Sequence, residues 1–306
     1  MLICPKCSEE LSDKSPPACK NCDWNGVSHH GIPDYLSSYE FNNSVLRDYL
    51  DHYDHIARDD LDNGIVSERY VKNQAVNLID FLGDVSEADV ADIGCGKGYL
   101  VGELLRKGAA RVTAIDIALP YLARFVDSPR VNPVRANSEN LPFKNEFDVI
   151  VSTDVMEHVF NLGSFLYSVN RALKQGGKVC IRVPYRENLL AYSLHLGCPY
   201  PFAHLRGFNR RLLKDYMTGA GFTVKRFALH GFGFGMPQPL WTRGRLRTRL
   251  YRFIKDWAES KMEHPADVTK WKSSYARLLM RPNTISVIGY KKFKIQPRSS
   301  GGFDLV

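Results

Sequence analysis

Short apolar runs alternate with stretches of helical periodicity through the middle of the chain. Apolar residues recur at helical spacing from Val71 to Leu82, and Gly83 is a suitable helix stop. The expected strands are residues 90–93, 112–116, 131–134, 147–152 and 178–183, and the helices between them are residues 99–107, 121–125 and 162–173. This alternation predicts a mostly parallel sheet that is covered on both faces and binds ligands at the carboxyl ends of its strands.

The pattern continues late in the chain with a helix at residues 208–220 and strands at residues 222–227 and 284–290. The expected domains are a ribbon at residues 1–36, a linker or helical cap at 37–70, the main domain at 71–291 and a disordered tail at 292–306. Residues 229–282 form an insertion before the last strand. Its periodicity predicts a helical cap with one apolar face, surrounded by arginines.

The net charge of +8 is concentrated in that insertion. Between Trp241 and Arg281 there are eleven Lys or Arg against four Asp or Glu, an excess of seven. This basic surface could hold an anionic group of a ligand or rest on an anionic membrane. No apolar run reaches the roughly 18 residues that a spanning helix needs. We therefore expect a cytoplasmic protein that can lie at the inner face of the membrane.

Four of the seven cysteines lie in two C-x-x-C pairs near the amino terminus: Cys4, Cys7, Cys19 and Cys22. Without a secretion signal, this pattern favours metal ligation over disulfides. Four thiolates can surround one Zn²⁺ and leave no position for a catalytic water, so we expect a structural zinc ribbon. An acidic and histidine-rich stretch at residues 51–62 could also bind a metal, but its composition favours a solvated helix near a pocket mouth.

The segment with the clearest chemistry is a glycine-rich turn after the first strand of the main domain. Gly94, Gly96 and Gly98 let the backbone approach a ligand closely, and Asp92 precedes them. Asp116 ends the next strand, where a carboxylate can accept both hydroxyls of a ribose. The spacing differs from the G-x-G-x-x-G of dinucleotide enzymes, and Asp92 would repel a pyrophosphate. A ligand with an ammonium and a sulfonium, such as S-adenosylmethionine, suits both acids.

Five ordered motifs resemble those of the class I S-adenosylmethionine-dependent methyltransferases, in the branch that includes ubiquinone-type and many small-molecule enzymes. They begin at Asp92, Ile115, Asn137, Phe147 and Leu173, and the resemblance extends over residues 71–290. It implies a Rossmann-like, seven-stranded sheet with helices on both faces, ending in an antiparallel strand pair. The donor contacts that it implies are Asp92, Gly94, Cys95, Gly96, Gly98, Asp116, Ile117, Asn137, Ser138, Glu139 and Thr153.

Methyl transfer requires a nucleophile held in line with the S–CH₃ bond, and a general base helps when the acceptor is a hydroxyl. The candidate bases are His158, after the fourth strand, and His204, in a His-x-Arg-x-Phe stretch that resembles one near the substrate in related enzymes. The fourth strand ends Ser152-Thr-Asp-Val rather than in the Asn/Asp-Pro-Pro-Tyr/Phe motif that binds a planar amine. This difference favours oxygen or carbon acceptors.

Three functions remain open from the sequence. The first is O-methylation of a small molecule or saccharide, including a nucleotide-linked or lipid-linked glycan. The second is methylation of ribosomal RNA, because a zinc module before this domain resembles the guanine-N1 enzymes, although their knuckle is completed by a histidine. The third is a non-catalytic binding module. The intact acids and glycines favour an enzyme, and the position of the basic surface favours the first function.

Overall fold

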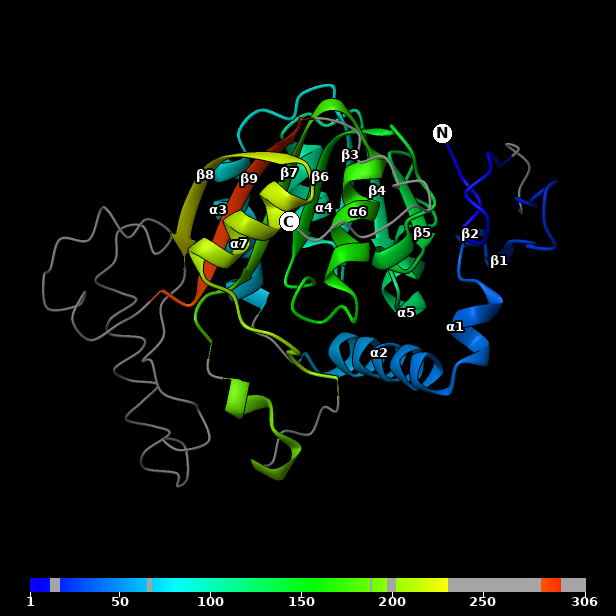
Figure 1. The fold of residues 1–306 in the computed structure, drawn as a ribbon, viewed down its shortest axis with the longest axis horizontal. Helices are drawn as coiled ribbons and strands as arrows, with labels where there is room; N and C mark the ends of the chain where they lie inside the picture. Colours follow the sequence, from blue (N-terminus) through cyan, green and yellow to red (C-terminus); the bar gives the residue numbers. More distant parts are fainter. Residues whose placement is uncertain (12–16, 65–67, 188, 197–201, 231–281, 293–306) are drawn as a thin grey trace, which may run out of the picture.

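The computed structural model describes residues 1–11, 17–64, 68–187, 189–196, 202–230 and 282–292 (Figure 1). Within these residues nine strands form one sheet in the order β1-β2-β5-β4-β3-β6-β7-β9-β8. The strands are β1 (Val27–His29), β2 (Ile32–Asp34), β3 (Asp89–Ile93), β4 (Arg111–Asp116), β5 (Val131–Arg135), β6 (Phe147–Thr153), β7 (Leu173–Pro184), β8 (Phe222–His230) and β9 (Thr284–Lys291). The helices are α1 (Ser38–Asn42), α2 (Ser44–Asn63), α3 (Glu68–Leu82), α4 (Tyr99–Arg106), α5 (Leu119–Leu122), α6 (Leu162–Ala172) and α7 (Arg210–Gly219).

Strands β3 to β9 form the seven-stranded unit that the sequence predicts. In the sheet order β5-β4-β3-β6-β7 each strand is parallel to its neighbours. Strand β9 pairs antiparallel with both β7 and β8. The expected fold class is therefore confirmed. The strand order reverses between β3 and β6, because β4 and β5 lie on one side of β3 and β6 and β7 on the other. Ligands of open α/β sheets bind at this reversal, beyond the carboxyl ends of the strands.

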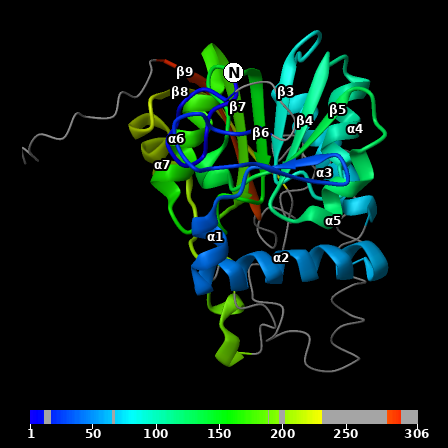
Figure 2. The same ribbon diagram turned by 90° about the vertical axis from the view of Figure 1, so that its right-hand side faces the viewer.

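Helices cover both faces of the sheet, and each face has its own apolar core. Figure 2 shows α6 and α7 on one side and α3, α4 and α5 on the other. Phe165 and Val169 of α6 are fully buried in the first core. Leu78 of α3 and Leu104 of α4 are buried in the second. The sheet is thus fixed from both sides, and its carboxyl edge is left for the site.

Helix α2 crosses that carboxyl edge (Figures 1 and 2). It is the acidic and histidine-rich stretch of the sequence, capped by Asn43 at its start and ending at Gly64 in a left-handed conformation. Asp54 accepts a hydrogen bond of 2.9 Å from the N–H of Leu119. Asp60 forms an ion pair of 2.9 Å with Lys97 in the glycine-rich turn. These carboxylates attach α2 to the main domain.

The amino-terminal segment is continuous with the main sheet. The hairpin β1–β2 adds two strands to the expected seven, because β2 pairs with β5 through Asp34 and Arg135. Arg135 also forms ion pairs with Asp34, at 3.2 Å, and with Asp54 of α2, at 3.6 Å. Trp24 is buried and stacks on Tyr35 with ring centroids 5.9 Å apart. A ribbon docked in this way shares its core with the main domain.

The predicted basic helix and the disordered tail lie almost entirely outside the described residues, which resume only at residue 282 and end at 292. None of the helices within the described ranges is both long enough and apolar enough to cross a bilayer.

Candidate functional site

The glycine-rich turn after β3 takes a backbone path that requires glycine. Gly94 and Gly98 have φ of +72° and +77°, and an added Cβ would lie 2.2 Å from Val155 and 2.3 Å from Phe125 respectively. Gly96 has φ of +48°, but its Cβ would meet no protein atom within 4 Å. The first and third glycines are therefore fixed by protein packing. The second faces open space, which suits close approach of a ligand.

Asp116 lies at the end of β4 beside this turn. One carboxylate oxygen accepts from the N–H of Gly96 at 3.0 Å, and the other accepts from the N–H of Ala118 at 2.9 Å. Cys95 Sγ lies 4.0 Å from the same carboxylate. A carboxylate has about four acceptor positions, so Asp116 can accept from a ribose hydroxyl as well as from these backbone groups. Burial raises the pKa of Asp116 to about 6.

Asp92, at the end of β3, is the acid that lines a cavity. The cavity has a volume of about 300 Å³, and its wall includes Gly94, Gly96 and Thr153. Asp92 is 1% exposed, and neither of its carboxylate oxygens has a hydrogen-bond partner among the described residues. Leaving a buried carboxylate without a partner is costly, and the ammonium of an amino acid would offset that cost. The residues present thus fit the two ends of S-adenosylmethionine.

Sequence reasoning missed several residues of the same cavity wall, among them Gln74 of α3 and Arg182 of β7. Arg182 is 8% exposed and forms an ion pair with Asp154, and it donates to Gln74 Oε1 at 3.4 Å. Its charge opposes the rise in the pKa of Asp92, which burial and Asp116 bring to about 7. The signal was an arginine within the apolar run at residues 179–183 of β7. Arg182 places a positive charge next to Asp92.

The loop predicted to contact adenine follows β5. The carbonyl of the Asn137 side chain accepts from the N–H of Glu139 at 3.0 Å and caps a short turn that contains Ser138. Both carboxylate oxygens of Glu139 accept from backbone N–H groups at Phe160 and Asn161, at 2.8 and 2.9 Å. Asn137 keeps one lone pair for an adenine amine. Glu139 instead joins this loop to the start of α6.

The remaining predicted donor contact, Ile117, follows Asp116. Its carbonyl accepts from Arg135 Nε at 3.0 Å, so the backbone at the end of β4 is attached to the same arginine that joins the ribbon and α2. This places Ile117 in the support of the ribose acid.

The two candidate bases lie side by side. The rings of His158 and His204 are 4.7 Å apart in an edge-to-face arrangement. Glu187 accepts from Nδ1 of His204, and Tyr192 stacks on the same ring at 4.1 Å. Burial lowers the pKa of His158 to about 4, so its imidazole is neutral near pH 7. The structure thus brings both residues to one place.

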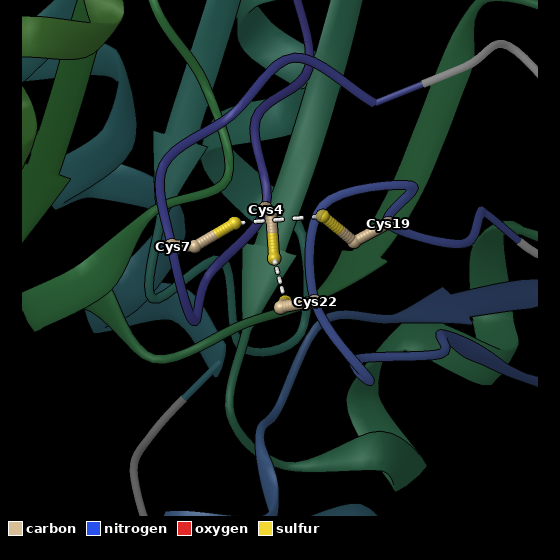
Figure 3. Close-up of side chains that lie close together, drawn as sticks. All are labelled: Cys4, Cys7, Cys19 and Cys22. Atoms are coloured by element: carbon tan, nitrogen blue, oxygen red, sulfur yellow. Dashed lines mark hydrogen bonds between the residues drawn. The ribbon is translucent and has the colours of Figure 1, made fainter.

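The four amino-terminal cysteines converge (Figure 3). Cys4 and Cys22 have sulfur atoms 3.7 Å apart, those of Cys7 and Cys19 are 3.4 Å apart, and all four lie within 4.8 Å of one another. A tetrahedron with Zn–S bonds of about 2.3 Å has sulfur–sulfur edges of about 3.8 Å. The N–H groups of Lys6 and Asn21 point at the sulfurs of Cys4 and Cys19, each at 3.4 Å. The donor set fits one zinc ion.

Comparison with protein families identifies a methyltransferase domain over residues 67–226, which is more than half of the chain. A protein of Mycolicibacterium smegmatis named as an S-adenosylmethionine-dependent methyltransferase is 30% identical over 149 residues, which cover 47% of this chain and 56% of that protein. The ubiquinone biosynthesis O-methyltransferase of Rickettsia bellii is 31% identical over 101 residues, covering 31% and 41% respectively. This chain spans about half the length of the curated relatives that it matches.

A similar fold is present in a chain from the complex between the Haloferax volcanii Trm112 methyltransferase activator and its methyltransferase. That chain has a TM-score of 0.53 and 16% sequence identity, and the match covers 79% of this chain and 98% of that one. At this identity the likeness concerns the fold alone.

Proposed function

The chain belongs to the family of methyltransferase domains, and from this premise we propose that it transfers the methyl group of S-adenosylmethionine to an oxygen of a small molecule or saccharide. The choice of S-adenosylmethionine as donor is supported chiefly by Asp92. It is a fully buried carboxylate without a hydrogen-bond partner among the described residues, and it lies in the wall of a cavity beside a glycine turn. Burying a carboxylate without a partner is costly, and a bound cation would offset that cost.

The chemistry of the transfer follows from the charges. Asp92 would hold the donor's ammonium and Asp116 its ribose, and Asn137 would accept from its adenine amine. Cys95, Thr153 and the first two glycines, Gly94 and Gly96, would enclose the donor between these contacts. With the donor fixed at both ends, the main contribution of the protein is to hold the acceptor in line with the S–CH₃ bond in a site that excludes water.

We place the acceptor on the side of His158 and His204. The His158 ring lies near α2: Tyr53 of that helix is edge-on to it with centroids 6.0 Å apart, and the Tyr53 hydroxyl donates to the carbonyl of Phe202 at 3.4 Å. An oxygen acceptor is favoured because the loop after β6 lacks the proline pair that grips a planar amine. The named activity of the Rickettsia bellii relative, an O-methyltransferase, supports the same choice.

The four cysteines would hold zinc as a structural ion. When the metal is bound, four thiolates cross-link the chain. They also fill all four positions of the ion, so no position is open for substrate. The basic insertion at residues 229–282 would contribute positive charge toward an anionic acceptor or membrane surface.

The test is a methyl-transfer screen with labelled donor on three acceptor pools: nucleotide-sugars, lipid extracts and total RNA. We expect label in a saccharide or lipid-linked fraction, and none with the Asp116→Ala variant. Label only in RNA, with donor-independent binding that falls steeply with salt, would replace the small-molecule acceptor with a nucleic acid. Calorimetry with S-adenosylmethionine tests the donor separately, and no binding at millimolar concentration would overturn the enzyme assignment.

A further inference from the structure

A second group of side chains that could hold a metal ion lies apart from the four cysteines, with Glu157 and His158 on the loop after β6 and His204 on the segment before α7. We propose that Glu157, His158 and His204 bind a divalent transition-metal cation, and that this cation holds the acceptor's oxygen for methyl transfer. The second half of the proposal rests on the proposed function, whereas binding of the cation does not.

The three side chains are arranged for a common ligand. One ligand atom of each lies within 4.8 Å of those of the other two. Nitrogen and oxygen ligands bind Zn²⁺ at about 2.0–2.2 Å, so in a tetrahedral site they lie about 3.4 Å apart. The side chains would close by roughly 1.5 Å or less, which rotation about their χ angles can supply.

Glu157 is the strongest evidence for a ligand. It is 0% exposed, and neither of its carboxylate oxygens is hydrogen-bonded to another described residue. An uncompensated buried carboxylate is strongly destabilising. A cation between Glu157 and the two imidazoles would neutralise the charge and use the free oxygens.

Each histidine has one ring nitrogen whose lone pair can bind the proposed cation. Nδ1 of His158 has no partner among the described residues, while backbone groups of Phe202 and Ala203 are hydrogen-bonded to its ring. His204 has Nδ1 bonded to Glu187, which leaves the lone pair of a neutral ring on Nε2. A carboxylate or carbonyl bonded to the second ring nitrogen is the usual support of a metal-binding histidine.

The two segments that carry these residues are hydrogen-bonded to each other, although the bonded residues lie forty-eight positions apart in the sequence. The N–H of Leu205, next to His204, donates to the carbonyl of Glu157 at 3.0 Å. Arg206 donates to the carbonyls of Met156 and Phe160, at 3.2 and 3.1 Å. The two segments are therefore held in register, and the three ligands stand on a fixed frame rather than on a free loop.

The ligand set indicates the class of cation. Imidazole suits Zn²⁺, Fe²⁺, Co²⁺ and Ni²⁺, and one carboxylate keeps Mn²⁺ possible, whereas Mg²⁺ and Ca²⁺ prefer oxygen ligands. Three protein ligands leave positions open for an acceptor hydroxyl, whose proton a cation makes easier to lose to water. The oxygen would then form the O–CH₃ bond as the S–CH₃ bond breaks, with the electron pair staying on sulfur to give S-adenosylhomocysteine.

Binding is tested on the full chain with zinc already in the four-cysteine site. Mn²⁺ and then Co²⁺ are titrated, with free Mn²⁺ followed by electron paramagnetic resonance and Co²⁺ by its visible absorption. We expect one additional cation per chain, and affinity at least 10-fold weaker in Glu157→Gln and in His204→Gln. His55→Gln, a substitution of the same kind at an exposed position of α2, should bind as the wild type does.

Thermal melting distinguishes a ligand from a residue that only supports the fold. Glu157→Gln keeps the shape of the side chain, so the metal-free variant should melt no lower than the metal-free wild type, and added Mn²⁺ should no longer raise its melting temperature. Equal cation binding by the wild type and both site variants, or binding of neither cation by the wild type, would overturn the proposal. Calorimetry with S-adenosylmethionine in the same samples keeps failure of this site separate from failure of the donor site.

Discussion

Asp92 and Asp116 are both buried carboxylates at strand ends, yet their surroundings give them different tasks. Asp116 has a backbone N–H on each oxygen, whereas Asp92 has none and faces the cavity. Burial is the first cause of the raised pKa in each, and the charge of Asp116 adds to the effect at Asp92. Asp116 is already stabilised as an anion, and Asp92 becomes so when a cation binds.

This difference predicts how donor binding depends on pH. The pKa of Asp92 is about 7 without ligand, and the donor's ammonium binds its ionised form. Below pH 7 a proton must first leave, so the dissociation constant for S-adenosylmethionine should rise by up to about tenfold per pH unit. Calorimetry from pH 7.5 to 5.5 measures the slope. Asp92→Asn should bind weakly with a flatter profile, and a wild-type constant that does not change over this range would refute the pairing.

Gly96 should separate ligand binding from folding. A methyl group at this position meets no protein atom within 4 Å, so Gly96→Ala adds mainly the strain of its positive φ, roughly 1–3 kcal/mol. The same group would enter the space given to the donor, so affinity for S-adenosylmethionine should fall by at least about 10-fold. Gly176→Ala is the matched control, because it has φ of +74° and open space but lies away from the cavity. Unchanged affinity in Gly96→Ala would place the donor elsewhere.

At the scale of the elements, α2 is the part that closes the site. Its charged side chains, which the sequence suggested were solvated, turn partly toward the sheet edge: Asp60 pairs with Lys97 of the glycine turn and accepts from the hydroxyl of Tyr121 at 3.0 Å. Both Asp60 and Tyr121 line the donor cavity. The helix therefore covers the cavity through polar contacts that can break and re-form.

These contacts predict the rate at which the donor leaves. Asp60→Asn removes a partly buried ion pair, which is worth about 1 kcal/mol, so dissociation of S-adenosylmethionine should be roughly 5-fold faster. Stopped-flow displacement measures this rate. Asp59→Asn changes a neighbour that bonds only locally, to Asn63 at 2.7 Å, and should leave the rate as it is. Equal rates in the two variants would show that α2 does not hold the cavity closed.

At the scale of the whole molecule, the ribbon is part of the main fold. The main chain of Ile3 donates to the carbonyl of Pro142 at 3.0 Å, and Asn140 donates to the carbonyl of Pro5 at 2.6 Å. Cys4, Trp24 and Phe143 belong to one buried cluster. The ribbon thus supports the loop predicted to contact adenine, and loss of the ribbon's metal should destabilise that loop.

Cys7→Ser tests this coupling without touching the second proposed metal site. A ribbon that folds independently would unfold on losing its metal and leave the sheet intact. With the shared core, we expect instead one cooperative transition whose melting temperature falls by about 5 °C or more, since a domain of this size shifts by roughly 2–4 °C per kcal/mol. Hydrogen exchange should quicken in β5 as well as in the ribbon. Ser28→Ala, an exposed change in β1, is the control. Faster exchange confined to residues 1–36 would show an independent ribbon.

The sequence by itself determined the sheet, the position of Asp92 and Asp116 at its strand ends and the two cysteine pairs, because each depends on signals that are local in the chain. Strands such as β6 and helices such as α6 follow from apolar periodicity, and a glycine turn at a strand end allows few conformations. Asp92 and Asp116 could be placed because parallel strands bring their carboxyl ends to one edge.

Only the tertiary structure decided which distant residues share a site. Two histidines that seemed to be alternatives lie together because Leu205 and Arg206 fix their segment on the loop after β6, and Arg182 reaches the donor acids from a strand read only as apolar core. The ribbon became an edge of the sheet through the pairing of β2 with β5. Such contacts depend on packing between segments far apart in the chain, and no periodicity within either segment records them.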